Sequence, residues 1–255
     1  MLTATLPAVL TAAFGAGFID AMVGGGGLIL VPALLAVLPR ELPAAVLGTG
    51  KVASIFGTAS AVARYTRSVR IQWRLLLPAA TLALVCSMIG AHALTRIPVQ
   101  TFRPLVPVVL TIVAAYTLIH RDFGEHHAPH AMTGGRWWLA VLMIAATGFY
   151  DGFFGPGTGS FFMFMFVRVF GFDFLNAAAS ARLMNVATNG AALALLASRV
   201  ELFWMYGLSM AVCNVAGSLL GTRLAIRRGA RFVRLVFMVV VTALIVKTAW
   251  DAVSG

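Results

Sequence analysis

Four charged residues stand inside apolar stretches of this 255-residue sequence: Asp20, Lys51, Asp151 and Arg182. An ionisable side chain at the centre of a bilayer costs about 2.5–3.5 kcal/mol on insertion scales, so each one needs a partner, water or a ligand. A buried basic group can hold an anion, and a carboxylate beside it can take up a proton and free that group. The four residues therefore predict either structural ion pairs or an anion site with an ion-coupling step.

The same residue types occur twice at a constant spacing. Residues 17–20 (Gly-Phe-Ile-Asp) return as residues 148–151 (Gly-Phe-Tyr-Asp) at an offset of 131. The same offset of 131 relates three further pairs: Lys51 and Arg182, Ser54 and Asn185, and Thr58 and Asn189. This spacing predicts an internal duplication in which each half brings its own carboxylate, basic residue and polar side chains.

Glycine runs interrupt two long apolar segments, 2–38 and 137–170. The first contains four consecutive glycines at 24–27, and the second contains Gly-Pro-Gly-Thr-Gly at 155–159. A helix-interior Gly costs about 1 kcal/mol and a Pro about 3 kcal/mol, so both helices should break there. The leg after each break is too short to cross a bilayer, which favours a re-entrant segment. Irregular backbone at membrane depth survives only where protein buries it or where it lines a cavity.

An anion site at these breaks would combine backbone and side-chain donors. Glycine turns leave N–H groups unshielded, and the helix that follows adds its positive end. Residues three or four apart share one helix face, which groups the polar side chains with a basic residue in each half. The predicted ligands are Gly25, Gly26, Lys51, Ser54, Gly157, Thr158, Arg182, Asn185 and Asn189, and the predicted coupling sites are Asp20 and Asp151.

A structural alternative explains the same residues without a ligand. Asp20 would pair with Lys51 and Asp151 with Arg182, so that each ion pair holds one half together. The polar side chains would then form hydrogen bonds between helices, as Ser, Thr and Asn often do inside membranes. The two interpretations remain open from the sequence.

Composition places all of these residues in a membrane. Hydrophobic residues make up 60% of the chain and charged residues 11%, and the mean hydropathy is +0.94. A soluble domain carries about 25% charged residues. The net charge of +11 does not indicate a nucleic-acid partner, because the basic residues form short clusters between apolar runs. The chain is predicted to be a multi-pass membrane protein with the lipid bilayer as its surroundings.

Six further segments have the length and composition of spanning helices: roughly 43–63, 74–95, 102–120, 176–197, 203–222 and 232–250. Arginines cluster before residue 75 and after residue 222, and basic loops stay on the cytoplasmic side. Equivalent loops of the two halves then lie on opposite sides. We therefore expect an all-α protein of two inverted repeats, 1–125 and 137–255, joined by a polar linker at 126–136. Each repeat would contain one broken, re-entrant segment and three transmembrane helices.

The residues that carry the duplication also resemble a known family. Residues 17–32 resemble the N-terminal signature of the sulfite exporter TauE/SafE family of membrane permeases, and residues 151–159 and 182–189 resemble its repeat. The resemblance covers essentially the whole chain. It implies a secondary transporter, not an enzyme, that carries sulfite or an organosulfonate across the bacterial inner membrane. No cofactor is implied; the coupling ion would be a proton or sodium, and a homodimer is an open alternative.

Two other functions remain open. A passive anion channel of the same fold would differ in allowing no uphill flux under a proton or sodium gradient. A membrane enzyme or assembly subunit would have to use Cys86, Cys213 or the linker histidines (His126, His127 and His130). Nothing in the sequence resembles a membrane protease, a haem site or an ATPase motif, which makes this second function the weaker one.

Overall fold

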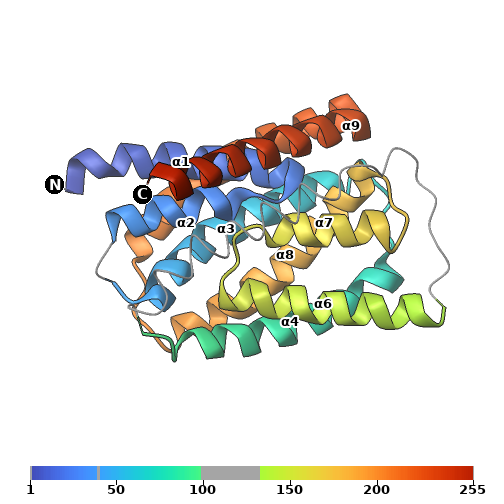
Figure 1. The fold of residues 1–255 in the computed structure, drawn as a ribbon, viewed down its shortest axis with the longest axis horizontal. Helices are drawn as coiled ribbons and strands as arrows, with labels where there is room; N and C mark the ends of the chain where they lie inside the picture. Colours follow the sequence, from blue (N-terminus) through green and yellow to red (C-terminus); the bar gives the residue numbers. More distant parts are fainter. Residues whose placement is uncertain (1, 39–40, 99–132, 255) are drawn as a thin grey trace.

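A computed structural model describes residues 2–38, 41–98 and 133–254, and its regular structure is entirely helical in that part of the chain. The described helices are α1 (Leu2–Val23), α2 (Gly26–Val37), α3 (Pro43–Tyr65), α4 (Trp73–Leu94), α6 (Gly135–Phe153), α7 (Thr158–Arg168), α8 (Phe174–Ala197) and α9 (Trp204–Ser254) (Figure 1). The prediction of an all-helical fold is confirmed. The predicted span 102–120 and residues 126–132 of the predicted linker lie outside the described residues.

Four described helices are long and apolar enough to cross a membrane. The segments that qualify are Leu6–Val23, Pro43–Tyr65, Trp73–Leu94 and Trp204–Val233, which belong to α1, α3, α4 and α9. The predicted spans 43–63, 74–95 and 203–222 fall on three of them. Helix α8 covers the predicted span 176–197 and has 24 residues, among them Arg182 and three asparagines, and it is not one of these four.

Element α9 contains both of the last two predicted spans. It continues for 51 residues from Trp204 to Ser254, and only Gly229 (φ 73°, ψ −171°) departs from helical geometry within it. The left-handed conformation at Gly229 costs a glycine little and would strain any other residue. Gly229 therefore joins two helices, and the predicted spans 203–222 and 232–250 fall on opposite sides of it.

Both glycine runs break their helices, as predicted. Gly24 separates α1 from α2 with φ 86°, and Gly155 and Gly157 separate α6 from α7 with φ 94° and 83°. After the first break α2 turns back along α1 (Figure 1), and the Gly26 N–H donates to Asp20 Oδ1 at 3.2 Å. After the second break α7 folds back on α6, where the rings of Tyr150 and Phe161 meet edge to face at 5.5 Å.

The long helices pack against partners that are distant in sequence. Helix α4 lies against α6 and α8, whereas α9 lies against α1 and α3. Helix α3 also contacts α8. In Figure 1, α1 runs from the left, where the N-terminus is marked, to the right, and α6 runs from right to left. Helix α4, which precedes residue 99, thus packs against helices that follow residue 132, and α9 packs against helices that precede residue 99.

The two glycine turns touch each other between these helices. A Cβ atom added at Gly24 would overlap the backbone of Gly159, and one at Gly27 would lie 2.9 Å from Pro156 Cα. The Ser160 hydroxyl bridges the turns by donating to the Val23 carbonyl at 2.9 Å. This close backbone contact brings the breaks in α1–α2 and α6–α7 to one place, where the buried charges also lie.

Candidate functional site

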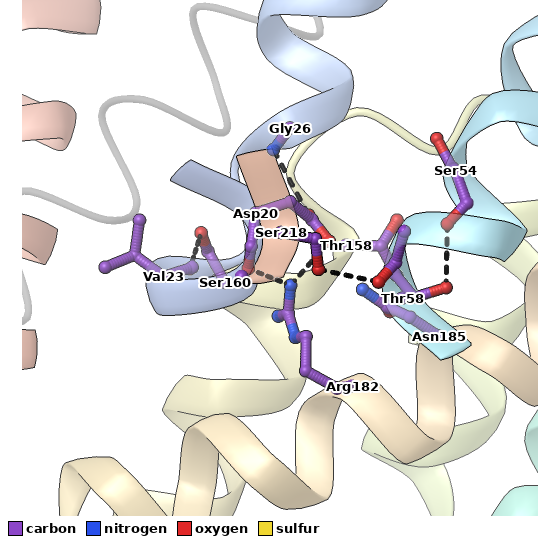
Figure 2. Close-up of polar contacts among 12 residues, drawn as sticks. Asp20, Val23, Gly26, Ser54, Thr58, Thr158, Ser160, Arg182, Asn185 and Ser218 are labelled. Carbon is purple, nitrogen blue, oxygen red and sulfur yellow. Dashed lines mark hydrogen bonds and ion pairs between the residues drawn. The ribbon is translucent and has the colours of Figure 1, made fainter. Parts of the chain in front are cut away.

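Two ion pairs connect the segments on either side of residues 99–132. Lys51 Nζ of α3 lies 3.1 Å from Asp151 Oδ2 of α6, and Arg182 Nη1 of α8 lies 2.8 Å from Asp20 Oδ2 of α1. Figure 2 shows Arg182 extending from α8 towards Asp20. The alternative pairing, Asp20 with Lys51 and Asp151 with Arg182, is wrong. Helix α3 packs against α8, and the two glycine turns touch each other. These contacts orient each basic residue towards the carboxylate of the other segment.

A small cavity of about 50 Å³ lies beside the glycine turns. One water needs about 10–15 Å³ of such volume, so the cavity has room for a few waters or one small anion. Its polar lining is Asp20, Lys51, Ser54, Asp151, Thr158, Asn185 and Asn189, its apolar wall includes Leu30, Val31, Leu47 and Phe154, and its glycines are Gly24, Gly27, Gly50, Gly155 and Gly159. Seven polar residues around so small a space form a site built for a polar occupant.

Lys51 is the basic group on the cavity wall. Its side chain is 6% exposed, and its Nζ contacts Asp151 Oδ2 at 3.1 Å and Asn189 Oδ1 at 3.0 Å. An ammonium group has three donors, and among the described residues the third has no partner. The two bonds fix the position of the charge, and the remaining N–H is available to a ligand in the cavity.

Arg182 is more deeply buried than Lys51 and does not line the cavity. Its side chain has no exposed surface, and Nη1 donates to both the carboxylate and the main-chain carbonyl of Asp20. Nε and Nη2 have no partner within the described residues, and neither does Asn185 Oδ1. A buried unsatisfied group costs about 1–3 kcal/mol, so this conformation leaves hydrogen-bonding capacity unused beside the cavity.

Gly159 keeps this part of the cavity wall thin. A Cβ atom at Gly159 would overlap Arg182 Nη2 and would lie 2.8 Å from Asn185 Nδ2. Any larger residue would push the guanidinium and the amide away from the cavity. The absence of a side chain at Gly159 therefore allows the charge of Arg182 to lie directly behind the cavity wall.

The two short helices present different N-termini to the site. The Gly26 N–H at the start of α2 is bonded to the Asp20 carboxylate. Helix α7 starts after Gly157 without a side-chain cap, and its first residues, Thr158 and Gly159, line the cavity. A helix N-terminus carries a partial positive charge. The unneutralised positive end of α7 therefore faces the same cavity as Lys51.

The structure brings most of the predicted site residues together. Lys51, Ser54, Thr158, Asn185 and Asn189 line one cavity with the predicted coupling residues Asp20 and Asp151, whereas Arg182, Gly25, Gly26 and Gly157 do not line it. The glycines that do line it were missed, because the sequence cannot tell which members of a glycine run face inwards. The Tyr150 hydroxyl, which donates to the Pro156 carbonyl at 2.6 Å, was also missed, although Tyr150 directly precedes Asp151.

Together, the fold and the site define a class of protein. Four of the described helices have membrane-spanning length, the pairs α1–α2 and α6–α7 are broken at glycine runs, and buried charges line a small polar cavity at the breaks. In membrane transporters, discontinuous helices commonly form the binding site where their ends meet. The architecture is that of a multi-pass membrane transporter.

Sequence comparison identifies the family. The family model "Sulfite exporter TauE/SafE" matches residues 9–248, so the chain belongs to the TauE/SafE family of membrane transporters. Similar curated proteins include the probable membrane transporter protein ORF9 of Sinorhizobium sp, which is 33% identical over 95% of this chain and 92% of its own length. The probable membrane transporter protein YfcA of Escherichia coli K12 is 32% identical over 93% of this chain and 87% of its own. No solved structure matches significantly.

Proposed function

We propose that this protein is an ion-coupled secondary transporter of a small sulfur-containing anion, sulfite or an organosulfonate, across the bacterial inner membrane. The observation that carries the proposal is Lys51, a buried cation in a polar cavity whose third donor has no partner among the residues the structure describes. The uncapped N-terminus of α7 adds a second source of positive potential to the same space. The family description supports the sulfur anion in particular.

The bound anion would lie between Lys51 and the start of α7. Its oxygens would accept a hydrogen bond from Lys51 Nζ, with the amides of Asn185 and Asn189 orienting them and the N-terminus of α7 adding positive potential. Ser54 supplies a further hydroxyl on the same cavity wall. Arg182 acts through space in this conformation, because its Nη2 lies behind Gly159. Gly25, Gly26 and Gly157 shape the turns that place these donors.

Coupling would follow because Asp151 and the anion compete for Lys51. Asp151 holds Lys51 at 3.1 Å, and a proton on Asp151 would remove the negative charge that competes with the anion. Anion binding would then favour protonation of Asp151, and loss of the proton would favour anion release. Asp20 and Arg182 form the corresponding pair on the other side of the turns. A sodium ion at the carbonyls of the broken helices is the alternative coupling ion.

The proposed architecture is two inverted repeats, 1–125 and 137–255, with a linker at 126–136. The opposite directions of α1 and α6 in Figure 1 and the reciprocal packing of α4 and α9 support it. Arg64 Nη1 donates to the Leu219 carbonyl at 3.3 Å. This contact places the basic end of α3 beside the start of the second arginine cluster, as a shared cytoplasmic side requires.

The first test is the thermal stability of the detergent-purified protein with sulfite, sulfate, thiosulfate, taurine, sulfoacetate, formate or chloride. A ligand at about 100 times its Kd adds about 2.7 kcal/mol to the folded state. We expect a sulfur oxyanion to stabilise the wild type and not Lys51→Gln. Arg67→Gln, at an exposed position outside the cavity, is the matched control and should behave as the wild type.

Flux into proteoliposomes then separates a transporter from a channel. The stabilising anion should accumulate against its gradient when a proton or sodium gradient is imposed. Flux that is always downhill would establish the passive channel instead. Full transport by Lys51→Gln would remove Lys51 from the site, and stabilisation by none of the sulfur anions would overturn the substrate class.

A further inference from the structure

The described helices fall into two groups by how they pack. We name them the α1 group (α1, α2, α3 and α9) and the α6 group (α4, α6, α7 and α8). In the α1 group, α9 interlocks with α1: a Cβ at Gly17 would overlap the Asn214 carbonyl oxygen, and one at Gly221 would overlap that of Phe18. Helix α9 also holds α3, because the Ser218 hydroxyl donates to the Gly57 carbonyl at 2.6 Å.

The α6 group is interlocked in the same way. A Cβ at Gly152 would overlap the Ser87 carbonyl oxygen, and one at Gly148 would lie 2.6 Å from that of Ala83, so α4 and α6 pack backbone to backbone. The Ser87 hydroxyl joins α4 to α8 by donating to the Thr188 carbonyl at 2.9 Å. Helices packed this closely have no room to slide, because interiors are close-packed and resist small displacements.

The boundary between the groups combines apolar and polar contacts. It includes the contact of α3 with α8, the meeting of the glycine turns, the two ion pairs and apolar side chains of both groups that share two core clusters. The cavity lies on this boundary: the α1 group contributes Asp20, Lys51 and Ser54, and the α6 group contributes Asp151, Thr158, Asn185 and Asn189. An anion or a proton in the cavity would act directly on the two ion pairs that cross this boundary.

We infer that transport moves the α1 group against the α6 group as two rigid bodies, with α9 moving with the earlier segment and α4 with the later one. The inference rests on the proposed function and adds which helices move together. The moving units are then not the two sequence halves, since each contains one long helix of the other. The pairs Asp20–Arg182 and Lys51–Asp151 bridge the two bodies in this structure.

Engineered disulfides test this division. Gly48 of α3 and Leu196 of α8 belong to different groups, and a Cβ at Gly48 would lie 3.4 Å from Leu196 Cβ, near the Cβ separation of about 3.5–4.5 Å in a disulfide. Gly48→Cys/Leu196→Cys should therefore link the two bodies. The matched control is Ser60→Cys/Ser218→Cys, which links α3 to α9 within the α1 group, where the hydroxyl oxygens lie 3.3 Å apart. Both pairs are made in a Cys86→Ser/Cys213→Ser background.

Oxidation of the cross-group pair should reduce anion flux at least tenfold, and reductant should restore it. Oxidation of the control pair should leave flux within twofold of the reduced protein. Undiminished flux through the oxidised cross-group pair, or a block by the control disulfide alone, would overturn the inference. A reduced protein that transports none of the anions would instead count against the proposed function.

A second measurement does not require a known substrate. Spin labels on α9 and α3 should give one narrow distance distribution in detergent and in lipid vesicles. Labels on α3 and α8, placed towards the Gly48–Leu196 end, should give a broader or two-peaked distribution that shifts with pH or salt. A single narrow and invariant distance across the groups would overturn the inference whether or not transport is observed.

Discussion

At the scale of single residues, Lys51 and Arg182 correspond in sequence but not in environment. Lys51 lines the cavity and keeps a donor for a ligand, whereas Arg182 is fully buried and bonds Asp20 through one nitrogen. Under the proposed function, Lys51 is accordingly the group that would contact the anion. Arg182 is a positioning residue, because it fixes Asp20, which in turn bonds the N-terminus of α2.

Lys51→Met should destabilise the protein by about 3–5 kcal/mol, because it leaves the Asp151 carboxylate buried and unpaired. In the double variant Lys51→Met/Asp151→Asn the charge is gone from both partners, and most of the stability should return. Thermal unfolding in detergent measures both effects. Neither variant should be stabilised by the sulfur anion. Anion stabilisation in the double variant would show that the site lies elsewhere.

Arg182→Met/Asp20→Asn should behave differently from the Lys51 double variant. It replaces both partners of the Asp20–Arg182 ion pair with neutral residues, so the protein should fold and should still be stabilised by the anion. The affinity for the anion should be weaker because a nearby positive charge is lost. The ratio of the anion Kd in this variant to that of the wild type measures the effect. Complete loss of binding in a folded protein would instead make Arg182 a direct ligand.

The sequence predicted the polar residues of the cavity and not how they pair. The constant offset selected Asp20, Lys51, Asp151 and Arg182 because it compares residue types along the chain. It carries no information on which basic residue faces which carboxylate. That is decided by the packing of α3 on α8 and by the contact of the glycine turns, both of which join residues more than 100 positions apart.

At the scale of helices, glycine sets how closely the elements approach. Helices in membranes associate through small residues that let backbones come near one another. Here Gly17 and Gly221 serve the contact of α1 with α9, and Gly148 and Gly152 serve that of α6 with α4. These glycines act by the volume they leave free, since all four lie in helices without positive φ.

Gly17→Ala should therefore be far more damaging than Gly15→Ala on the same helix. A methyl at Gly17 would overlap the Asn214 carbonyl oxygen, while nothing lies within 4 Å of one at Gly15. Overpacking costs about 1–3 kcal/mol, whereas alanine in an open helix position is favoured over glycine by about 1 kcal/mol. The melting temperature should fall for Gly17→Ala and should stay the same or rise for Gly15→Ala. Equal melting temperatures would contradict a tight α1–α9 contact.

The helix breaks at the glycine runs were predictable, and the short length of the interruption within α9 was not. Runs of glycine have no helical alternative, so the breaks at 24–27 and 155–159 follow from local chemistry. The arginine-rich stretch after residue 222 looked like a loop because of its charge. Its arginines and alanines are nonetheless good helix formers, and the exposed side chains of Arg223, Arg227 and Arg228 keep their charges outside the core, so only Gly229 interrupts the helix.

At the scale of the whole molecule, neither sequence half contains its own complete packing. Helix α4 finds its neighbours in α6 and α8, and α9 finds its neighbours in α1 and α3. The predicted division at 126–136 describes how the sequence repeats. In the packing, α4 of the first half joins the helices of the second half, and α9 of the second half joins those of the first. A pattern of hydrophobicity cannot reveal this exchange, because it records only what each helix buries and not against which partner.

Two chains covering residues 1–127 and 128–255 should be unstable when made separately and should assemble when made together. Each fragment alone would leave the glycine-lined faces of its long helices without their partners. Co-purification through a tag on one fragment, followed by the anion-stabilisation assay, measures assembly. A first fragment that purifies as a folded monomer on its own would contradict the exchange.

The contact between α1 and α9 also bears on how the protein is made. About 180 residues separate the end of α1 from the start of α9, and ribosomes add about 5–20 residues per second. Helix α1 therefore waits on the order of 10–40 s for α9. During that time its glycine-bearing face meets lipid or the insertion machinery instead of its final partner. Quality control of a stalled or truncated chain would act on that exposed face of α1.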